Sequence, residues 1–140
     1  MSASPKRKEA LKVILDSNAL FVPSELKLDI FAEAEHLLNR KLDFILLSPV
    51  KRELELLAKK DSPKIRKQAV YALKVAERCK NVAVDEDEKL STDDAIIKVA
   101  KAWSSPVFTN DRQLRRKLRD ISVPVIYVRQ KSRLEIDGLI

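Results

Sequence analysis

The sequence predicts an α/β fold, a three-layer α/β/α sandwich around a central parallel five-stranded sheet with the strand order 3-2-1-4-5. Three observations support this prediction. Apolar runs of strand length alternate with longer segments in which apolar residues recur at helical spacing. Serine and threonine caps, some of them beside proline, mark the starts of the expected helices. Acidic residues follow four of the apolar runs, where a parallel sheet of this order gathers its binding residues.

The first half of the chain is expected to form two strands and three helices. The first strand, 11–15, is the apolar run LKVIL, which ends at an aspartate. A Pro-Ser pair then opens a helix over 24–40, and the run FILL forms the second strand at 44–47. Ser-Pro pairs, with serine as N-cap and proline in the first turn, predict helices over 48–60 and 62–79.

The second half is expected to hold three strands, two helices and a tail. A helix begins at Ser91 or Thr92, either of which can cap it. The other expected elements are strands at 81–84, 106–109 and 123–128 and a short basic helix over 111–119. Residues 1–10 are expected to be a flexible N-terminus, and residues 131–140 a C-terminal tail to which no structure is assigned.

The composition fits one basic domain. A length of 140 residues suits a single domain, and 45% hydrophobic residues are enough for a core. The net charge of +7 favours polyanions such as RNA or DNA, or an acidic membrane, although a basic surface also serves solubility. Charged residues make up 35% of the chain, and there is one glycine, with three glutamines and four asparagines. This composition resembles that of heat-adapted, thermophile proteins.

Several protein classes are excluded by the same sequence. A single cysteine rules out an internal disulfide and a zinc cluster built from cysteines. No apolar run approaches the roughly 20 residues that span a membrane. Residues 1–8 are polar and lack the apolar segment of a signal peptide. We therefore expect an intracellular, cytoplasmic protein without a membrane partner.

Acidic residues are expected to meet at the carboxyl edge of the sheet. The five candidates are Asp16, Glu53, Asp93, Asp94 and Asp111. Each has a structural alternative, because acids also cap helices and favour the first helical turn. Their joint placement indicates a Mg²⁺ or Mn²⁺ site, since carboxylates that share a small space repel each other unless a cation lies among them. The expected supporting polar residues are Ser17, Asn18, Thr109 and Asn110.

Four segments carry these acids and resemble motifs of the PIN-domain nuclease family: VILDSNAL, SPVKRELELL, STDDAIIKVA and TNDRQLRRKL. The resemblance runs from about Leu11 to Val128, so the PIN domain is placed at 11–130. It implies metal-dependent hydrolysis of RNA phosphodiester bonds. The implied catalytic quartet is Asp16, Glu53, Asp94 and Asp111. Asp94 directly precedes an alanine and fits the motif better than Asp93, which is kept as an additional metal ligand.

Within this family the chain is most similar to archaeal proteins related to ribosomal-RNA-processing PIN nucleases, and toxin ribonucleases are also similar. The resemblance implies RNA as the substrate, an antitoxin or a ribosome-assembly protein as a partner, and a homodimer. The basic helix beside the site would hold the RNA backbone by charge. Its cations are Arg112, Arg115, Arg116, Lys117 and Arg119.

Other function classes compete with this interpretation. Phosphatases of the haloacid dehalogenase type need a second aspartate two residues after the first, and that position is Asn18. Response-regulator receivers need a phosphate-accepting aspartate after the third strand and a lysine at the fifth strand. Neither requirement fits this sequence cleanly. A non-catalytic PIN-like module that binds RNA or protein would keep the fold without turnover, and the sequence alone leaves this alternative open.

Overall fold

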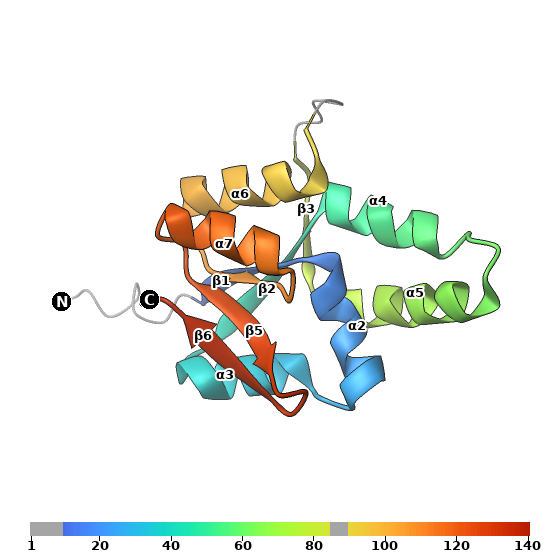
Figure 1. Cartoon of the computed structure of the whole chain (residues 1–140), viewed down its shortest axis with the longest axis horizontal. Helices are drawn as coiled ribbons and strands as arrows, with labels where there is room; N and C mark the ends of the chain where they lie inside the picture. Colours follow the sequence, from blue (N-terminus) through green and yellow to red (C-terminus); the bar gives the residue numbers. More distant parts are fainter. Residues whose placement is uncertain (1–9, 85–89) are drawn as a thin grey trace.

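The computed structural model describes residues 10–84 and 90–140, so the expected flexible N-terminus lies, except for Ala10, outside the described residues. Six strands of the described part form one sheet in the order β3-β2-β1-β4-β5-β6 (Figure 1). The first five strands in this order are parallel to one another, and their order confirms the prediction. The strands are β1 Leu11–Leu15, β2 Leu42–Leu47, β3 Lys80–Val82, β4 Val107–Phe108, β5 Val125–Arg129 and β6 Arg133–Asp137.

The sixth strand lies in the tail to which the sequence analysis assigned no structure. It pairs antiparallel with β5, and Val128 lies opposite Leu134. Gln130 and Lys131, in the turn between the two strands, have positive φ values of 53° and 56°. Short hairpin turns that need positive φ are normally recognisable by glycine or asparagine. Neither residue occurs in this turn, so the sequence gives no turn signal there.

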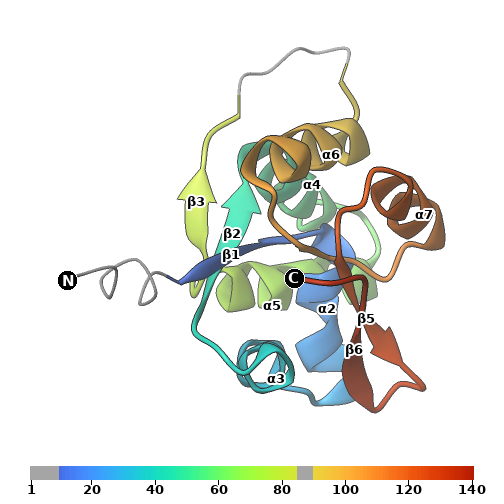
Figure 2. The ribbon, with the colours of Figure 1, turned by 90° about the vertical axis from the view of Figure 1, so that its left-hand side faces the viewer.

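The helices cover both faces of the sheet. They are α2 Ser17–Leu26, α3 Ile30–Leu38, α4 Ser48–Leu57, α5 Pro63–Ala76, α6 Thr92–Trp103 and α7 Arg112–Asp120. Figure 2 shows α2, α3 and α5 on one side of β1, with α6 and α7 on the other. This is the arrangement that right-handed crossovers produce when the strand order reverses after β3. No helix in the described ranges is long and apolar enough to cross a bilayer.

The single helix expected over 24–40 is two helices. The first, α2, begins directly after Asp16 and contains Pro23, which was expected to precede a helix. Its buried residues include Leu20 and Val22, and we attribute the tolerance of an interior proline to this packing. The chain then breaks at Lys27, which has a φ of 58°, and Asp29 caps α3.

The reversal of strand order places two strand ends side by side. β1 pairs with β4, so that Leu15 lies opposite Phe108, and both residues are fully buried. The next residues along the two strands are Asp16 and Thr109. In open α/β sheets this position, at the carboxyl ends of strands where the order reverses, is the usual ligand-binding position.

Candidate functional site

The carboxylate of Asp16 is fixed where β1 ends and α2 begins. The residue is only 5% exposed. Its Oδ1 accepts a hydrogen bond from the Ser17 backbone N–H at 2.8 Å and caps α2. Its Oδ2 accepts from the Thr109 hydroxyl at 2.7 Å and from the Asn18 amide at 3.1 Å. Both carboxylate oxygens are therefore oriented by the protein itself.

The pKa of Asp16 is raised above the usual value for an aspartate. Burial is the main cause, because loss of water disfavours the charged carboxylate. Hydrogen bonds from Thr109 and Ser17 lower the pKa and offset part of this effect. The negative charges of Asp93 and Glu53 raise it further. Asp16 therefore lies in the electrostatic field of two other acids, which come from different helices.

The expected supporting residues form one hydrogen-bond network between β1 and β4. The amide of Asn18 donates to Thr109 Oγ1 at 3.3 Å, and its Oδ1 accepts from the Asn110 backbone N–H at 3.0 Å. Asn110 Oδ1 in turn accepts from the Val128 N–H at 2.8 Å. The Thr109 hydroxyl also accepts from the Asp111 N–H at 3.1 Å. These bonds fix the strand ends that present the acids.

Glu53 approaches the same site from α4. The Ser17 hydroxyl donates to Glu53 Oε1 at 2.6 Å, so the residue after Asp16 links the first acid to the second. Glu53 is half-buried beside the buried Leu54, whereas Glu55 is exposed and points away. This is the difference that the apolar stripe of α4 predicts.

Of the neighbouring acids Asp93 and Asp94, it is Asp93 that the fold brings to the other acids. The pKa of Asp93 is raised, first by burial and then by the charge of Asp111, with smaller effects from Glu53 and Asp94. Asp94 is exposed, and its backbone N–H is capped by the Ser91 hydroxyl at 3.1 Å. The motif match had placed Asp94 first.

The helical phase of α6 explains this difference. Residues three and seven positions apart lie on the same face of a helix. Asp93 therefore shares its face with Ile96 and Ala100, which are fully buried. By the same rule Asp94 shares its face with Ile97, which is only partly buried, and with Lys101, which is exposed. A helical wheel drawn from the sequence contains this signal.

Asp111 combines a structural and an electrostatic role. Its Oδ1 caps α7 by accepting from the backbone N–H groups of Gln113 at 2.8 Å and Leu114 at 3.2 Å. Its negative charge also raises the pKa of Asp93. Lys117, two turns of α7 later, acts in the opposite direction and lowers that pKa. Lys117 was expected only as an RNA contact, and its position beside an acid of the cluster was not foreseen.

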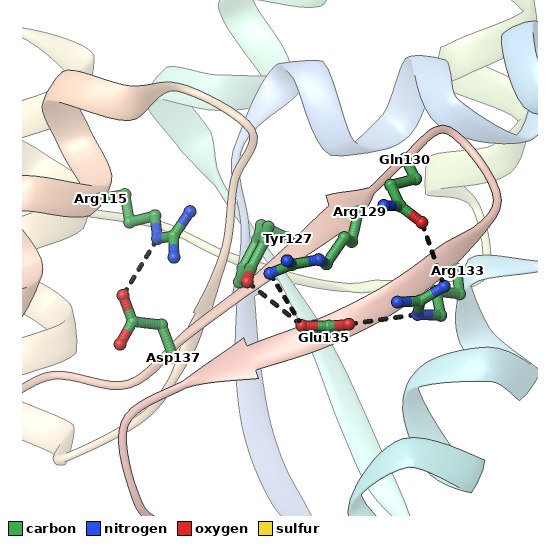
Figure 3. Close-up of polar contacts among 7 residues, drawn as sticks. All are labelled: Arg115, Tyr127, Arg129, Gln130, Arg133, Glu135 and Asp137. Atoms are coloured by element: carbon green, nitrogen blue, oxygen red, sulfur yellow. Dashed lines mark hydrogen bonds and ion pairs between the residues drawn. The ribbon is translucent and has the colours of Figure 1, made fainter.

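The basic helix α7 has two different faces. Arg112, Arg116 and Lys117 are exposed. Arg115 and Arg119 are partly buried and form ion pairs with Asp137 of β6, at 3.1 and 3.2 Å. Figure 3 shows the side chain of Arg115 directed at Asp137.

The partly buried face of α7, which carries Arg115 and Arg119, also makes an aromatic contact. The guanidinium carbon of Arg115 also lies 3.7 Å from the ring centroid of Tyr127. Two of the five expected RNA contacts, Arg115 and Arg119, are therefore engaged within the protein. The other three, Arg112, Arg116 and Lys117, are exposed to solvent.

A comparison of the sequence with protein families identifies the family of this chain. A family model described as a PIN-like domain matches residues 13–131, which is most of the chain. The chain belongs to the PIN-like domain family. The matched range of this PIN-like domain ends before β6, so the strand that holds the inner face of α7 lies outside it.

Curated relatives of this PIN-like domain carry the names of ribonucleases. Ribonuclease VapC4 of Methanocaldococcus jannaschii is 34% identical over 130 residues, which cover 92% of this chain and 98% of the relative. Ribonuclease VapC9 of Archaeoglobus fulgidus is 30% identical over 96 residues, 69% of this chain and 68% of the relative.

Solved structures share the fold of this PIN-like domain. The PIN domain endonuclease Utp24 superposes with a TM-score of 0.76 at 24% identity, covering 92% of each chain. A domain of a functionally unknown protein from Methanocaldococcus jannaschii has a TM-score of 0.63 at 18% identity, covering 94% of this chain and 99% of the other. At these identities the likeness concerns the fold.

The donor set of this PIN-like domain suits a hard divalent cation. Its candidate ligands are carboxylate oxygens, which Mg²⁺ and Mn²⁺ prefer. Within residues 10–84 and 90–140, no three Asp, Glu, His or Cys side chains form a ready-made metal cage. Such a cage is not required for Mg²⁺, which keeps several waters and is usually held by one or two carboxylates together with substrate phosphates. The residues present therefore fit this type of ion.

Proposed function

We propose that this PIN-like domain is an endoribonuclease that hydrolyses phosphodiester bonds of RNA with Mg²⁺ or Mn²⁺. The observation that carries the proposal is that hydrogen bonds join three segments that bear acids. The Ser17 hydroxyl, next to Asp16, donates to Glu53 at 2.6 Å. The Thr109 hydroxyl donates to Asp16 at 2.7 Å and accepts from the Asp111 backbone N–H at 3.1 Å. Carboxylates crowded in this way are stabilised by a bound cation. The ribonuclease names of two relatives support RNA as the substrate.

The roles of the residues follow from their contacts. Asp16 and Asp93 would hold the ion, and Glu53 and Asp111 would complete its surroundings. When bound, the ion supplies a water of lowered pKa and neutralises charge that develops on the phosphate. Ser17 and Thr109 do not react, but their hydrogen bonds keep the carboxylates of Glu53 and Asp16 in orientation.

Positive charge beside the acids would hold the substrate. Lys117 lies near enough to Asp93 to lower its pKa, so it is placed to receive a phosphate oxygen next to the ion. Arg112 and Arg116 extend the same exposed face of α7 and would contact the neighbouring phosphates. Contacts of this kind give binding that depends on salt and only weakly on base sequence.

The proposal extends to the cellular setting. We infer a cytoplasmic protein that is controlled by a small antitoxin, because the curated relatives are named VapC ribonucleases. One chain in the crystal structure of VapBC2 from Rickettsia felis, which is bound to a DNA fragment from the promoter, shares the fold. The two chains superpose with a TM-score of 0.54 at 15% identity, over 76% of this chain and 92% of that chain. A neighbouring gene for a small antitoxin would support this role, and an isolated gene would favour a ribosome-assembly partner. Light scattering, which gives the molar mass in solution, tests whether the protein forms the expected homodimer.

Turnover of a labelled single-stranded RNA tests the main proposal. We expect cleavage with Mg²⁺ or Mn²⁺, none in EDTA, and loss of cleavage in Asp16→Asn. Asp61→Asn is the matched control, because Asp61 is an exposed acid in the turn between α4 and α5. Wild-type turnover by Asp16→Asn would contradict the assignment. RNA binding without turnover by the wild type under any metal would indicate the non-catalytic module instead.

A further inference from the structure

A stripe of lysines with an exposed tyrosine runs along α5, on elements that the candidate active site does not use. Lys64, Lys67, Tyr71 and Lys74 follow each other at spacings of three or four residues, which places them on one face of the helix. Tyr71 and the adjacent Val70 are each 47% exposed. The three lysines are exposed, and none of them forms an ion pair with another described residue.

A hollow of about 400 Å³ follows this stripe between α5 and the end of α2. It is lined by Ser24, Lys64, Lys67, Gln68, Val70, Tyr71 and Lys74. None of these lining residues is an aspartate or a glutamate. Tyr71 also lines a second hollow of about 390 Å³, which contains Lys27 and Arg78 together with Asp29. The tyrosine therefore belongs to two concavities that both carry cations.

We propose that this stripe binds a single-stranded segment of RNA, with phosphates on the lysines and a base stacked on Tyr71. It would be a second contact for the RNA chain outside the candidate active site, and it rests on the proposed function in taking RNA as the substrate. Surfaces that bind single strands combine a positively charged groove with exposed aromatic side chains. Protein–protein interfaces, by contrast, are depleted of lysine.

The stripe and the candidate active site lie near opposite ends of α2, and the residues between them include the buried Leu20 and Val22. Ser17 and Ser24 are seven residues apart and lie on the same face of this helix. Ser17 donates to Glu53 in the candidate active site, and Ser24 lines the hollow. The two serines are separated by about 10 Å along the helix axis. In Figure 1, α5 lies beside α2 and below α4, the helix that carries Glu53. An RNA chain of several nucleotides would reach from one place to the other.

Binding of a fluorescent oligouridine in EDTA tests the inference without turnover. The test variant is Lys67→Glu with Lys74→Glu. The matched control is Arg40→Glu with Lys41→Glu, which changes the charge equally at exposed residues near the amino end of β2. We expect the test variant to bind at least about tenfold more weakly and to lose about 1.4 units of salt slope, roughly 0.7 for each lost phosphate contact. The loss should shrink with an oligouridine too short to span both surfaces.

Substitutions of the tyrosine separate stacking from charge. Tyr71→Ala should weaken binding about tenfold while the salt slope stays unchanged, and Tyr71→Phe should retain the affinity. Circular dichroism confirms that each variant is folded. Equal affinities of the two double variants, or no effect of Tyr71→Ala, would overturn the inference.

A second probe distinguishes RNA from an acidic protein. Polyglutamate binding that requires Lys67 and Lys74, with oligouridine binding unaffected by them, would assign the stripe to an acidic protein and overturn the proposal for RNA. Failure of the nuclease proposal appears separately, as absent turnover, and does not alter affinities measured in EDTA. Conversely, if the wild type cleaves RNA and the test variant binds oligouridine as tightly as the wild type, only the proposed RNA contact on α5 is overturned.

Discussion

Asp137 Oδ1 lies 3.2 Å from Arg119 Nε, an ion pair that joins the last strand of the sheet to the basic helix α7. The residue after Asp137 is the only glycine of the chain, and its φ is 106°. A Cβ on Gly138 would lie 2.4 Å from Nη1 of the same arginine and 3.1 Å from the Cα of Pro124. The close approach of Arg119 to the end of β6 therefore depends on the missing side chain.

Gly138→Ala should destabilise the protein. The new methyl group would meet Arg119, and alanine at this positive φ carries backbone strain of about 1–3 kcal/mol. Denaturant unfolding measures the change. Asp137→Asn is the comparison, and it should cost less, at most about 1 kcal/mol, because its ion pairs are one third exposed. A larger effect of Asp137→Asn would show that the ion pairs, and not the glycine, hold α7.

Asp93→Asn should reduce RNA cleavage far more than Asp94→Asn. Asp93 shares the buried face of α6 and lies in the field of Asp111 and Glu53, whereas Asp94 is exposed. Loss of an acid that holds the ion should lower the rate by at least about a hundredfold. Initial rates at saturating Mn²⁺ measure both variants. The reverse order of activities would restore the quartet that the family motif implied.

Arg116→Ala and Arg115→Ala should affect different properties. Arg116 is exposed, so its loss should weaken RNA binding and reduce the salt slope by up to about one unit. Arg115 contacts Asp137 and Tyr127, so its loss should mainly lower the free energy of unfolding, by about 1 kcal/mol. Salt titrations of RNA binding and urea unfolding curves separate the two effects. An equal salt slope in Arg116→Ala and the wild type would mean that this face of α7 does not contact RNA.

The acids of the cluster should make the metal-free protein less stable at neutral pH. The pKa of Asp93 is raised in the folded state, so its protonated form is favoured there. Its contribution to stability is present below the unfolded pKa and is lost as the pH rises through the folded pKa. Asp93→Asn should therefore melt higher than the wild type in EDTA at pH 7, and this gain should shrink as the pH is lowered.

Metal should reverse this relation. An ion that binds only the native state at a hundredfold excess over Kd stabilises the protein by roughly 2.7 kcal/mol. The wild type should gain this stability in Mn²⁺, and Asp93→Asn should gain less. Asp94→Asn is the matched control and should behave like the wild type in both buffers. An unchanged melting temperature of the wild type on addition of Mn²⁺ would argue against an ion at this edge.

The architecture could be predicted because its signals are local. Apolar runs, serine caps and Ser-Pro pairs are short-range features, and the rules for parallel sheets convert their order into a topology. The same reasoning predicted that Asp16 and Asp111 lie at the switch point. The structure places Thr109, two residues before Asp111, within a hydrogen bond of 2.7 Å from Asp16. It failed at Pro23, where a local preference of proline gave way to the packing of α2.

What only the tertiary structure decided is the direction in which particular side chains point. Asp93 and Asp94 are neighbours of the same chemical type, and the burial of one face of α6 determines which of them meets the other acids. Arg115 points inward because β6 supplies Asp137, and the turn before β6 carries no glycine or asparagine by which it could be recognised. Residue order determines which elements form, whereas a side chain's partners depend on segments far away in the sequence that pack against it.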